Sequence, residues 1–448
     1  MAAHPEEDRV EYTERVWSQA RAVLGAGLWS VTQGALRYPD GLFPLMAESG
    51  SGCRLTDTTG REYVDWLMGW GTAVLGYRDE EVERAVIDQL RSSGPLLSLL
   101  HPLEVETARR VRELVPCAER VAFGKNGSDV LGIAVRLARA ATGREGILVC
   151  GYHGFHDWYM ALVPQCEGIP HGLRPLVRSF GYNDLDEVRA LFAEHGDAIA
   201  AVVLEPMAAA LPAPGFLEGL RKITLDHEAL LVFDEVMTAF RVDLGGAQGA
   251  TGVTPDLACL GKAMGNGMSL SALVGTREVM EVIARVGYGL TFRGELTALA
   301  AAHKTLEILE RDSVPAHLRE VGEEVQADFL QSCRRHGVPG ELIGPPARLQ
   351  MSFSAAGGIT PLGLQTLLVQ ECLKRGVFTN GAFFPSAAHG RHALELTRGV
   401  LDEGLEVLAR ATEKRSVRSF LDMEAVQIGY EDTALEDSGE AGSRTASC

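Results

Sequence analysis

The sequence predicts an α/β fold in which helices cover both faces of a largely parallel β-sheet. Two observations support this prediction: short apolar runs recur between residues 121 and 275, and helix-like stretches lie between many of them. This alternation is typical of parallel sheets, whose strands are buried on both faces. In such sheets ligands bind beyond the carboxyl ends of the strands, in the loops that follow them.

The expected elements follow one another in a regular order. We expect short buried strands at 121–124, 146–150, 198–205, 229–235, 256–261 and 269–275. Helix-like stretches at 128–143 and 184–196 separate some of these strands. After Glu310 the pattern changes to a long amphipathic helix, the strand-like RLQMSFS and another helix up to Lys374. This change predicts a second, α+β domain.

Composition and charge restrict the expected partners and compartment. The chain has 448 residues and a formal net charge of -18, which argues against nucleic acid or an anionic membrane as the main partner. No apolar run is long enough to span a bilayer, and the charged start lacks the apolar core of an export signal. The eight cysteines are scattered singly, so a cytoplasmic location is expected. The acidic residues after about 420 predict a mobile tail.

A glycine-containing segment, GKNGSDV at 124–130, precedes one of the expected helices. Backbone N–H groups of Gly127 and Ser128 at a helix start, together with the serine hydroxyl, suit a phosphate group. An ordinary N-cap serine is the alternative interpretation. Neither GKN here nor GKA at 261–263 is followed by the Ser or Thr of a Walker A loop, so nucleotide hydrolysis is not expected.

Aromatic residues cluster in YHGFHDWY at 152–159, directly after the expected strand GILVC. One ring could cover the face of a flat ligand, and packing of the rings in the core is the alternative. His153 and His156 have no third ligand close in sequence and no HExxH pattern occurs, so no metal site is expected.

Two acids and a lysine end neighbouring apolar runs. Asp234 and Glu235 close the run ALLVFDE, where a carboxylate is costly unless it meets a cation or a donor. Adjacent strand residues point to opposite faces, so at most one of these acids faces a given site, and a helix cap or ion pair is the alternative role. Lys262 lies between two apolar runs, which is a poor place for a solubilising lysine and a good one for covalent chemistry. An ordinary loop lysine is the alternative.

Taken together, these features fit pyridoxal 5'-phosphate. A helix start suited to phosphate, a cluster of aromatic rings, a carboxylate and a lysine occur along the chain in that order. The phosphate, ring face, ring nitrogen and aldehyde of the cofactor each need one of those groups.

The segments LLVFDEVMTAFRV and PDLACLGKAMGNGMSLSALVG resemble those of class III aminotransferases, which belong to the fold type I pyridoxal-phosphate superfamily. DEVMTAFRV in particular is similar to glutamate-1-semialdehyde aminomutases. The resemblance implies a large domain with a mostly parallel seven-stranded sheet, and a smaller α+β domain formed by both termini. The expected boundaries are 1–65 and 311–420 for the small domain, 66–310 for the large domain and 421–448 for the tail.

The resemblance also implies a role for individual residues. Lys262 matches the Schiff-base lysine and Asp234 the partner of the pyridine nitrogen, and these two are the expected catalytic residues. The further expected cofactor contacts are Gly127 and Ser128 at the phosphate, Tyr152 stacked on the ring, Val236 beneath it, Glu205, and Thr291 at the phosphate of the neighbouring subunit. A homodimer with shared active sites is therefore expected, with the segment 95–104 and the loop around Tyr288 at its interface.

The expected activity is transfer of an amino group from an amino acid donor, glutamate by family habit, to a keto sugar, cyclitol or small cyclic ketone or aldehyde. Pyridoxamine 5'-phosphate would be the intermediate. Departures from the aminomutase pattern support this choice: TFRGEL replaces TxSGNP at 291–296, and alanines occupy 208–210 where an asparagine is usual. The PVRAF stretch is also missing; Arg37 is the candidate substitute, and an ordinary surface arginine is the alternative interpretation. Glutamate-1-semialdehyde 2,1-aminomutase is the alternative, and a non-catalytic pyridoxal-phosphate fold is the third possibility.

Overall fold

The computed structural model describes residues 8–24, 46–163 and 166–422. The chain divides into two compact units. Within the described residues, unit 1 comprises those up to 68, 76–78 and those from 320 onward, and unit 2 comprises 69–75 and 79–319. Arg37 and residues 423–448 of the expected tail lie outside the described residues.

Unit 2 is built on a seven-stranded sheet with the strand order β4-β10-β9-β8-β7-β5-β6. The strands are β4 (Arg120–Gly124), β5 (Gly146–Cys150), β6 (Val177–Ser179), β7 (Ile199–Leu204), β8 (Leu230–Glu235), β9 (Leu257–Leu260) and β10 (Ser271–Gly275). Only β10 runs antiparallel to its neighbours, β4 and β9. The predicted mostly parallel, seven-stranded sheet is therefore confirmed.

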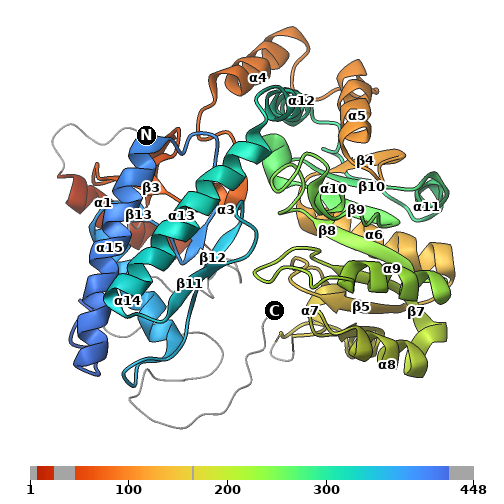
Figure 1. Ribbon diagram of the computed structural model, residues 1–448. Helices are drawn as coiled ribbons and strands as arrows, with labels where there is room; N and C mark the ends of the chain where they lie inside the picture. The colour runs from red at the N-terminus through yellow and green to blue at the C-terminus, as the bar shows by residue number, and fades with distance from the viewer. Residues whose placement is uncertain (1–7, 25–45, 164–165, 423–448) are drawn as a thin grey trace. The chain divides into compact units, whose positions relative to one another are not determined.

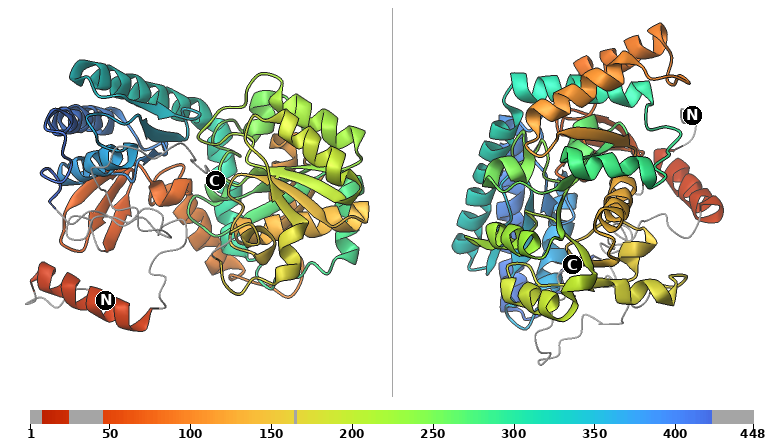
Figure 2. Two further views of the ribbon diagram at one scale, coloured as in Figure 1. Left: turned by 90° about the horizontal axis from the view of Figure 1, so that it is seen from below. Right: turned by 90° about the vertical axis from the view of Figure 1, so that its right-hand side faces the viewer.

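Apolar residues bury both faces of this sheet. Val232 packs with α6 (Gly127–Thr142) in a single core cluster, while Leu231 and Phe233 point to the other face and are also fully buried. Figures 1 and 2 show the helices lying on either side of the strands. The continuous apolar runs of the sequence follow from this double burial.

The remaining helices of unit 2 connect the strands or pack beside them. They are α4 (Glu80–Ser92), α5 (Pro102–Leu114), α7 (Asp157–Met160), α8 (Leu185–His195), α9 (Phe216–Asp226), α10 (Gly246–Thr251), α11 (Arg277–Glu281) and α12 (Leu296–Arg311). Four short 3-10 turns complete the described part of the unit: η1 (His171–Leu176), η2 (Gly196–Ala198), η3 (Lys262–Gly265) and η4 (Val282–Arg285). Helices α4 and α5 both pack against α12.

Unit 1 contains two small sheets and long helices. One sheet has the order β1-β2-β3-β13 and the other β11-β12-β14. The strands are β1 (Ala47–Ser51), β2 (Arg54–Asp57), β3 (Glu62–Asp65), β11 (Gly340–Ile343), β12 (Leu349–Phe353), β13 (Val377–Phe378) and β14 (Ala382–Phe383). The helices are α1 (Arg9–Val23), α14 (Pro361–Lys374), α15 (Arg391–Glu413) and most of α13 (Val314–His336), whose first residues belong to unit 2. The short turn α3 (Met68–Gly71) lies at the unit boundary.

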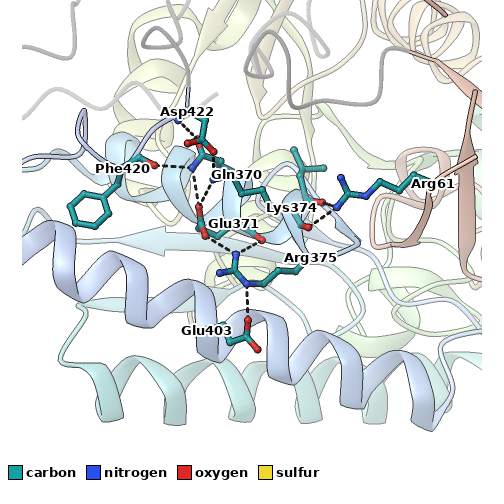
Figure 3. Close-up of polar contacts among 9 residues, drawn as sticks. Arg61, Gln370, Glu371, Lys374, Arg375, Glu403, Phe420 and Asp422 are labelled. Carbon is teal, nitrogen blue, oxygen red and sulfur yellow. Dashed lines mark hydrogen bonds and ion pairs between the residues drawn. The ribbon is translucent and has the colours of Figure 1, made fainter. Parts of the chain in front are cut away.

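A polar network closes the carboxyl end of α14 (Figure 3). The buried Glu371 accepts hydrogen bonds from Gln370 Nε2 at 2.9 Å and Arg375 Nη1 at 2.6 Å. Arg375 also pairs with Glu403 of α15 at 2.7 Å. Because Gln370 Oε1 accepts the Asp422 N–H at 3.0 Å, the last described residues are held against α14.

Candidate functional site

The predicted site residues of unit 2 lie at one edge of its sheet. Strands β5, β7, β8 and β9 are parallel neighbours, so their carboxyl ends meet at this edge. Tyr152 follows β5, Glu205 follows β7, Asp234 lies near the end of β8 and Lys262 follows β9. Ligands of parallel sheets bind at such an edge.

Asp234 is buried and is held by a histidine. Its Oδ2 lies 2.9 Å from Nδ1 of His153, and its Oδ1 accepts the Val236 N–H at 3.1 Å. The other ring nitrogen of His153, Nε2, lies 3.1 Å from the carbonyl oxygen of Cys150. A carbonyl oxygen only accepts hydrogen bonds, so this contact is a hydrogen bond in the tautomer that carries a proton on Nε2.

The Asp234 carboxyl group and the His153 imidazole form one buried hydrogen-bonded pair, and the tautomer of the ring decides which atom donates. The pair fixes the position of the carboxyl group at the end of β8.

Sequence reasoning considered His153 only as a metal ligand and missed its contact with Asp234. The signal that could have revealed it is the requirement of a buried acid for a donor, combined with a histidine that follows a strand of the same sheet. Among the described residues there is no group of three His, Cys, Asp or Glu side chains arranged to hold a metal ion.

Glu235 points to the opposite face from Asp234, as the alternation of strand residues predicts. It is fully buried and accepts hydrogen bonds from Thr238 Oγ1 at 2.8 Å and Gln248 Nε2 at 3.0 Å, besides the Ala247 N–H. Burial raises the pKa of Glu235, and these neutral donors offset only part of that effect. Glu235 therefore has the structural role, and only Asp234 faces the candidate site.

The amino end of α6 meets the loops that follow β5 and β8. A Cβ atom on Gly127 would lie 3.0 Å from both Cγ atoms of Val236, so a side chain there would crowd the valine. Ser128 lies against Gly154, whose φ is +88° and whose Cβ would fall within 2.1 Å of the Ser128 hydroxyl. Backbone N–H groups at this helix start thus lie beside Val236, with a serine hydroxyl close by.

Lys262 starts the turn η3 and has a left-handed backbone, with a φ of 43°. Such a conformation is uncommon for a residue with a Cβ atom and costs on the order of 1–3 kcal/mol, so the surrounding fold must impose it. Asn266, at the end of the same turn, accepts the Leu75 N–H at 2.9 Å and thereby anchors it. A Cβ atom on Gly261 would lie 3.5 Å from Val236 Cγ1, which places the start of this turn beside the valine.

The other predicted site residues have fewer described contacts with Asp234, Val236 and Lys262. The ring of Tyr152 is exposed and packs edge-on against Tyr159 at 5.7 Å. Glu205 lies beside Gly151, where an added Cβ would come within 3.2 Å of its Cγ. Thr291 is exposed in the turn before α12, and no described contact joins it to Asp234 or the other residues of the group.

Arg241 follows the acids of β8, where an arginine could bind a carboxylate or act inside the fold. The structure buries it completely, and its Nη2 donates to the carbonyl oxygen of Gly71 at 2.7 Å. This geometry supports the internal role.

Comparison with known proteins gives a consistent result. The family model described as Aminotransferase class-III matches residues 38–380. The chain is 35% identical over 370 residues to 3-aminobutyryl-CoA aminotransferase of Cloacimonas acidaminovorans, covering 81% of this chain and 88% of the relative. It is 34% identical to 2'-deamino-2'-hydroxyneamine transaminase of Streptomyces kanamyceticus, covering 80% of this chain and 90% of the relative.

Two further similarities concern an aminomutase and a solved structure. Glutamate-1-semialdehyde 2,1-aminomutase of Syntrophobacter fumaroxidans is 36% identical, covering 80% of this chain and 89% of the relative. The FumI protein of Sphingopyxis sp. MTA144, solved in its PLP internal aldimine form, superposes with a TM-score of 0.82 at 29% identity. That superposition covers 89% of this chain and 97% of the other.

Proposed function

We propose that this chain, which belongs to the class III aminotransferases, transfers an amino group from an amino acid donor to a keto sugar, cyclitol or small cyclic ketone or aldehyde. Glutamate is the donor in this proposal. The observation that carries it is the placement of Asp234 and Lys262 at the carboxyl ends of two adjacent parallel strands, β8 and β9. One acid and one lysine at the same sheet edge suit the two ends of a pyridine aldehyde.

The cofactor is pyridoxal 5'-phosphate. When bound, it carries the amino group between substrates and accepts the electrons that a substrate carbon releases. The described residues fit its chemistry, because an acid held by His153 and the helix start at Gly127 lie in the same unit.

Each residue of the site has a distinct proposed task. Lys262 would hold the cofactor through Nζ, and the same amine would move a proton to and from the substrate carbon. Asp234 keeps the pyridine nitrogen protonated, and His153 orients its carboxylate. The N–H groups of Gly127 and Ser128, in the segment 124–128 that we call the phosphate loop, bind the phosphate. Tyr152 and Val236 contact the cofactor ring, and Glu205 lies beside them as a further cofactor contact.

The acceptor class rests on relatives and on sequence differences. The relative named 2'-deamino-2'-hydroxyneamine transaminase matches over 80% of this chain. The alanines at 208–210 and the segment TFRGEL at 291–296 replace residues typical of aminomutases. Since the relatives also include aminomutases at 36% identity, transfer within one molecule is the second candidate.

The test separates these two reactions. The purified holoenzyme is given L-glutamate alone, and the absorbance of the aminated cofactor is followed together with the 2-oxoglutarate released. The proposal expects one equivalent of 2-oxoglutarate per site, and turnover only when a keto acceptor from a panel of sugars, cyclitols and cyclic ketones is added. Conversion of glutamate-1-semialdehyde without any second substrate, and no half-reaction with glutamate, would support the aminomutase instead.

We also propose that the active form is a homodimer with two shared sites. Leu99 and Leu100 are 83% and 68% exposed and Phe292 is 58% exposed, an unusual concentration of exposed apolar side chains. Leu296 N donates to the Pro95 carbonyl oxygen at 2.7 Å, which joins the 95–104 segment to the turn that contains Thr291. A symmetric dimer through this surface would bury these side chains and give each subunit the other's Thr291.

Subunit mixing tests the shared site. An inactive Lys262→Ala chain is combined with an inactive Thr291→Val chain under conditions in which subunits exchange. If Thr291 acts on the partner's phosphate, a mixed dimer contains one site with both defects and one intact site, so activity returns. Exchange without any recovered activity would contradict the shared site.

A cytoplasmic location completes the proposal. The seven cysteines within the described residues are all free thiols, as expected in a reducing compartment. Across the part of the chain that the structure covers, no helix combines the length and the apolar character that crossing a bilayer requires.

A further inference from the structure

We propose that Lys125 and Glu295 form a positioning pair that holds the phosphate loop in its binding conformation. This inference rests on the proposed function, because the phosphate loop is assigned there. Neither residue is among the expected cofactor contacts, and Glu295 is one of the residues by which TFRGEL departs from TxSGNP.

Lys125 lies in the phosphate loop, two residues before Gly127, and its side chain is fixed at both sides. Its Nζ lies 3.0 Å from Oε2 of Glu295 and donates to the carbonyl oxygen of Ser269 at 2.9 Å. Ser269 returns a hydrogen bond, since its hydroxyl donates to the carbonyl oxygen of Lys125 at 3.1 Å. The side chains of Lys125 and Glu295 are only 19% and 17% exposed, so salt screens this pair less than an ordinary surface ion pair.

Glu295 is itself held rigidly as the N-cap residue of α12. Its carboxylate accepts the N–H groups of Thr297 at 2.8 Å and Ala298 at 3.1 Å, and the Thr297 hydroxyl also donates to it. Burial alone would raise the pKa of Glu295, but the hydrogen bonds from Thr297 and Lys125 outweigh burial and lower that pKa. The carboxylate is thus an ionised, stationary anchor at a helix start, where negative charge is favoured.

The pair therefore connects three loops of unit 2 at one point. These loops precede α6, β10 and α12, and the last of them contains Thr291. A lysine next to the amino end of α6 is unfavourable against the helix dipole unless an anion neutralises it. Glu295 supplies that anion, and so fixes the backbone from which Gly127 and Ser128 would offer their N–H groups.

A positioning role makes a specific prediction about ligands. Disturbing the pair should weaken binding of the phosphate group and leave the contacts of the ring unchanged. Pyridoxal, which lacks the phosphate, is the matched probe. A general loss of stability would weaken both ligands alike.

The experiment measures dissociation constants of the apoprotein for pyridoxal 5'-phosphate and for pyridoxal by absorbance titration. Lys125→Met and Glu295→Gln should each weaken pyridoxal 5'-phosphate roughly tenfold, as expected for the loss of a charge-assisted hydrogen bond, and should change pyridoxal binding less than about twofold. The double variant should lose little more than either single variant, because both changes remove the same interaction. Lys125→Arg, which retains the charge, should restore most of the affinity.

Matched controls keep the outcomes distinct. The pair Lys304–Glu307 on α12, at 2.7 Å, is an ion pair away from the loop, so Lys304→Met and Glu307→Gln should leave both dissociation constants unchanged. Ser128→Ala tests the phosphate loop itself. If Ser128→Ala weakens only the phosphorylated ligand while Lys125→Met does not, the positioning pair is refuted and the proposed site stands. If Ser128→Ala affects neither ligand, the Ser128 hydroxyl makes no phosphate contact, and the positioning pair is then judged by Lys125→Met alone.

Two results would overturn the inference directly. One is equal weakening of pyridoxal and pyridoxal 5'-phosphate by Lys125→Met. The other is full additivity in the double variant. Lys125→Met is decisive even if Glu295→Gln unfolds α12, because Lys125 caps no helix.

Discussion

The end of β8 in unit 2 and the end of α14 in unit 1 both bury carboxylates, but they neutralise them differently. Glu371 in unit 1 has its cations within the network, from Arg375 at 2.6 Å and Lys374 at 3.4 Å. Burial alone would raise the pKa of Glu371, but hydrogen bonds from Gln370 and Arg375 outweigh burial and lower it. At β8, Asp234 has one imidazole and one backbone N–H as its contacts among the described residues.

This difference separates a structural acid from an acid that is available for a ligand. In the α14 network each charge already has its partner inside the unit, so the network has a stabilising task only. Asp234 is oriented by His153, and its edge of the sheet is where a ligand's cation would bind. The predictions below test this contrast, beginning with the largest effect.

The largest expected effect is that of Lys262→Ala. The variant should fold, because an alanine removes only a half-buried side chain, but it should lose turnover by on the order of a thousandfold or more. Mass spectrometry after borohydride treatment should find no covalent cofactor on the variant and one per chain on the wild type. Multiple turnovers at the wild-type rate would remove Lys262 from the site.

Asp234→Asn should have the next largest effect on activity. It keeps the shape of the side chain and removes the charge that stabilises a protonated pyridine, so kcat/KM should fall roughly a hundredfold or more. The unfolding temperature should change little, because the asparagine still hydrogen-bonds with His153. Near-normal kcat/KM would mean that Asp234 is as structural as Glu371.

Glu371→Gln should show the reverse pattern, with stability lost and kcat/KM of the folded enzyme retained. Removing the charge leaves Arg375 and Lys374 without their buried partner, at a cost of about 1–3 kcal/mol in the free energy of unfolding at neutral pH. Because the folded pKa of Glu371 is lowered from 4.5, this stabilisation is present above that value and is lost as pH falls through the folded pKa. Thermal unfolding from pH 7 to 3 should show the gap between wild type and variant closing in acid.

Glu235→Gln should have the smallest effect and the opposite dependence on pH. The folded pKa of Glu235 is raised from 4.5, so its contribution to stability is complete below 4.5 and is lost as pH rises through the folded pKa. The free energy of unfolding of the wild type should therefore fall relative to that of the variant as pH rises. At neutral pH the two should differ by no more than about 1 kcal/mol. If the free energies of unfolding of the Glu235 and Glu371 variants, each relative to the wild type, changed with pH in the same direction, the two acids would not differ as proposed.

Sequence patterns predicted the strands well, and with them the positions of Asp234 and Lys262 at strand ends, for a physical reason. A strand buried on both faces must be apolar throughout, so GILVC at 146–150 coincides with β5, and a lysine after such a run is conspicuous. Alternation likewise predicted that Asp234 and Glu235 diverge. These features depend only on residues close together in the chain.

The contacts that were missed join residues far apart in the chain. His153 and Asp234 are 81 residues apart, and Lys125 and Glu295 are 170 apart. No local period encodes such pairs, because which loops meet depends on the strand order of the sheet. The fold had to be known before either pairing was visible.

The position of β10 has a consequence for the order in which the protein is made. Within the seven-stranded sheet, β4 pairs with β10 alone, although residues 120–124 are synthesised long before 271–275. Closing so long a loop is slow, and a chain emerging from the ribosome has no partner for β4 until β10 is complete. Strand β4 therefore joins the sheet only after Lys262 has been synthesised, so the complete sheet edge forms late in the synthesis of the chain.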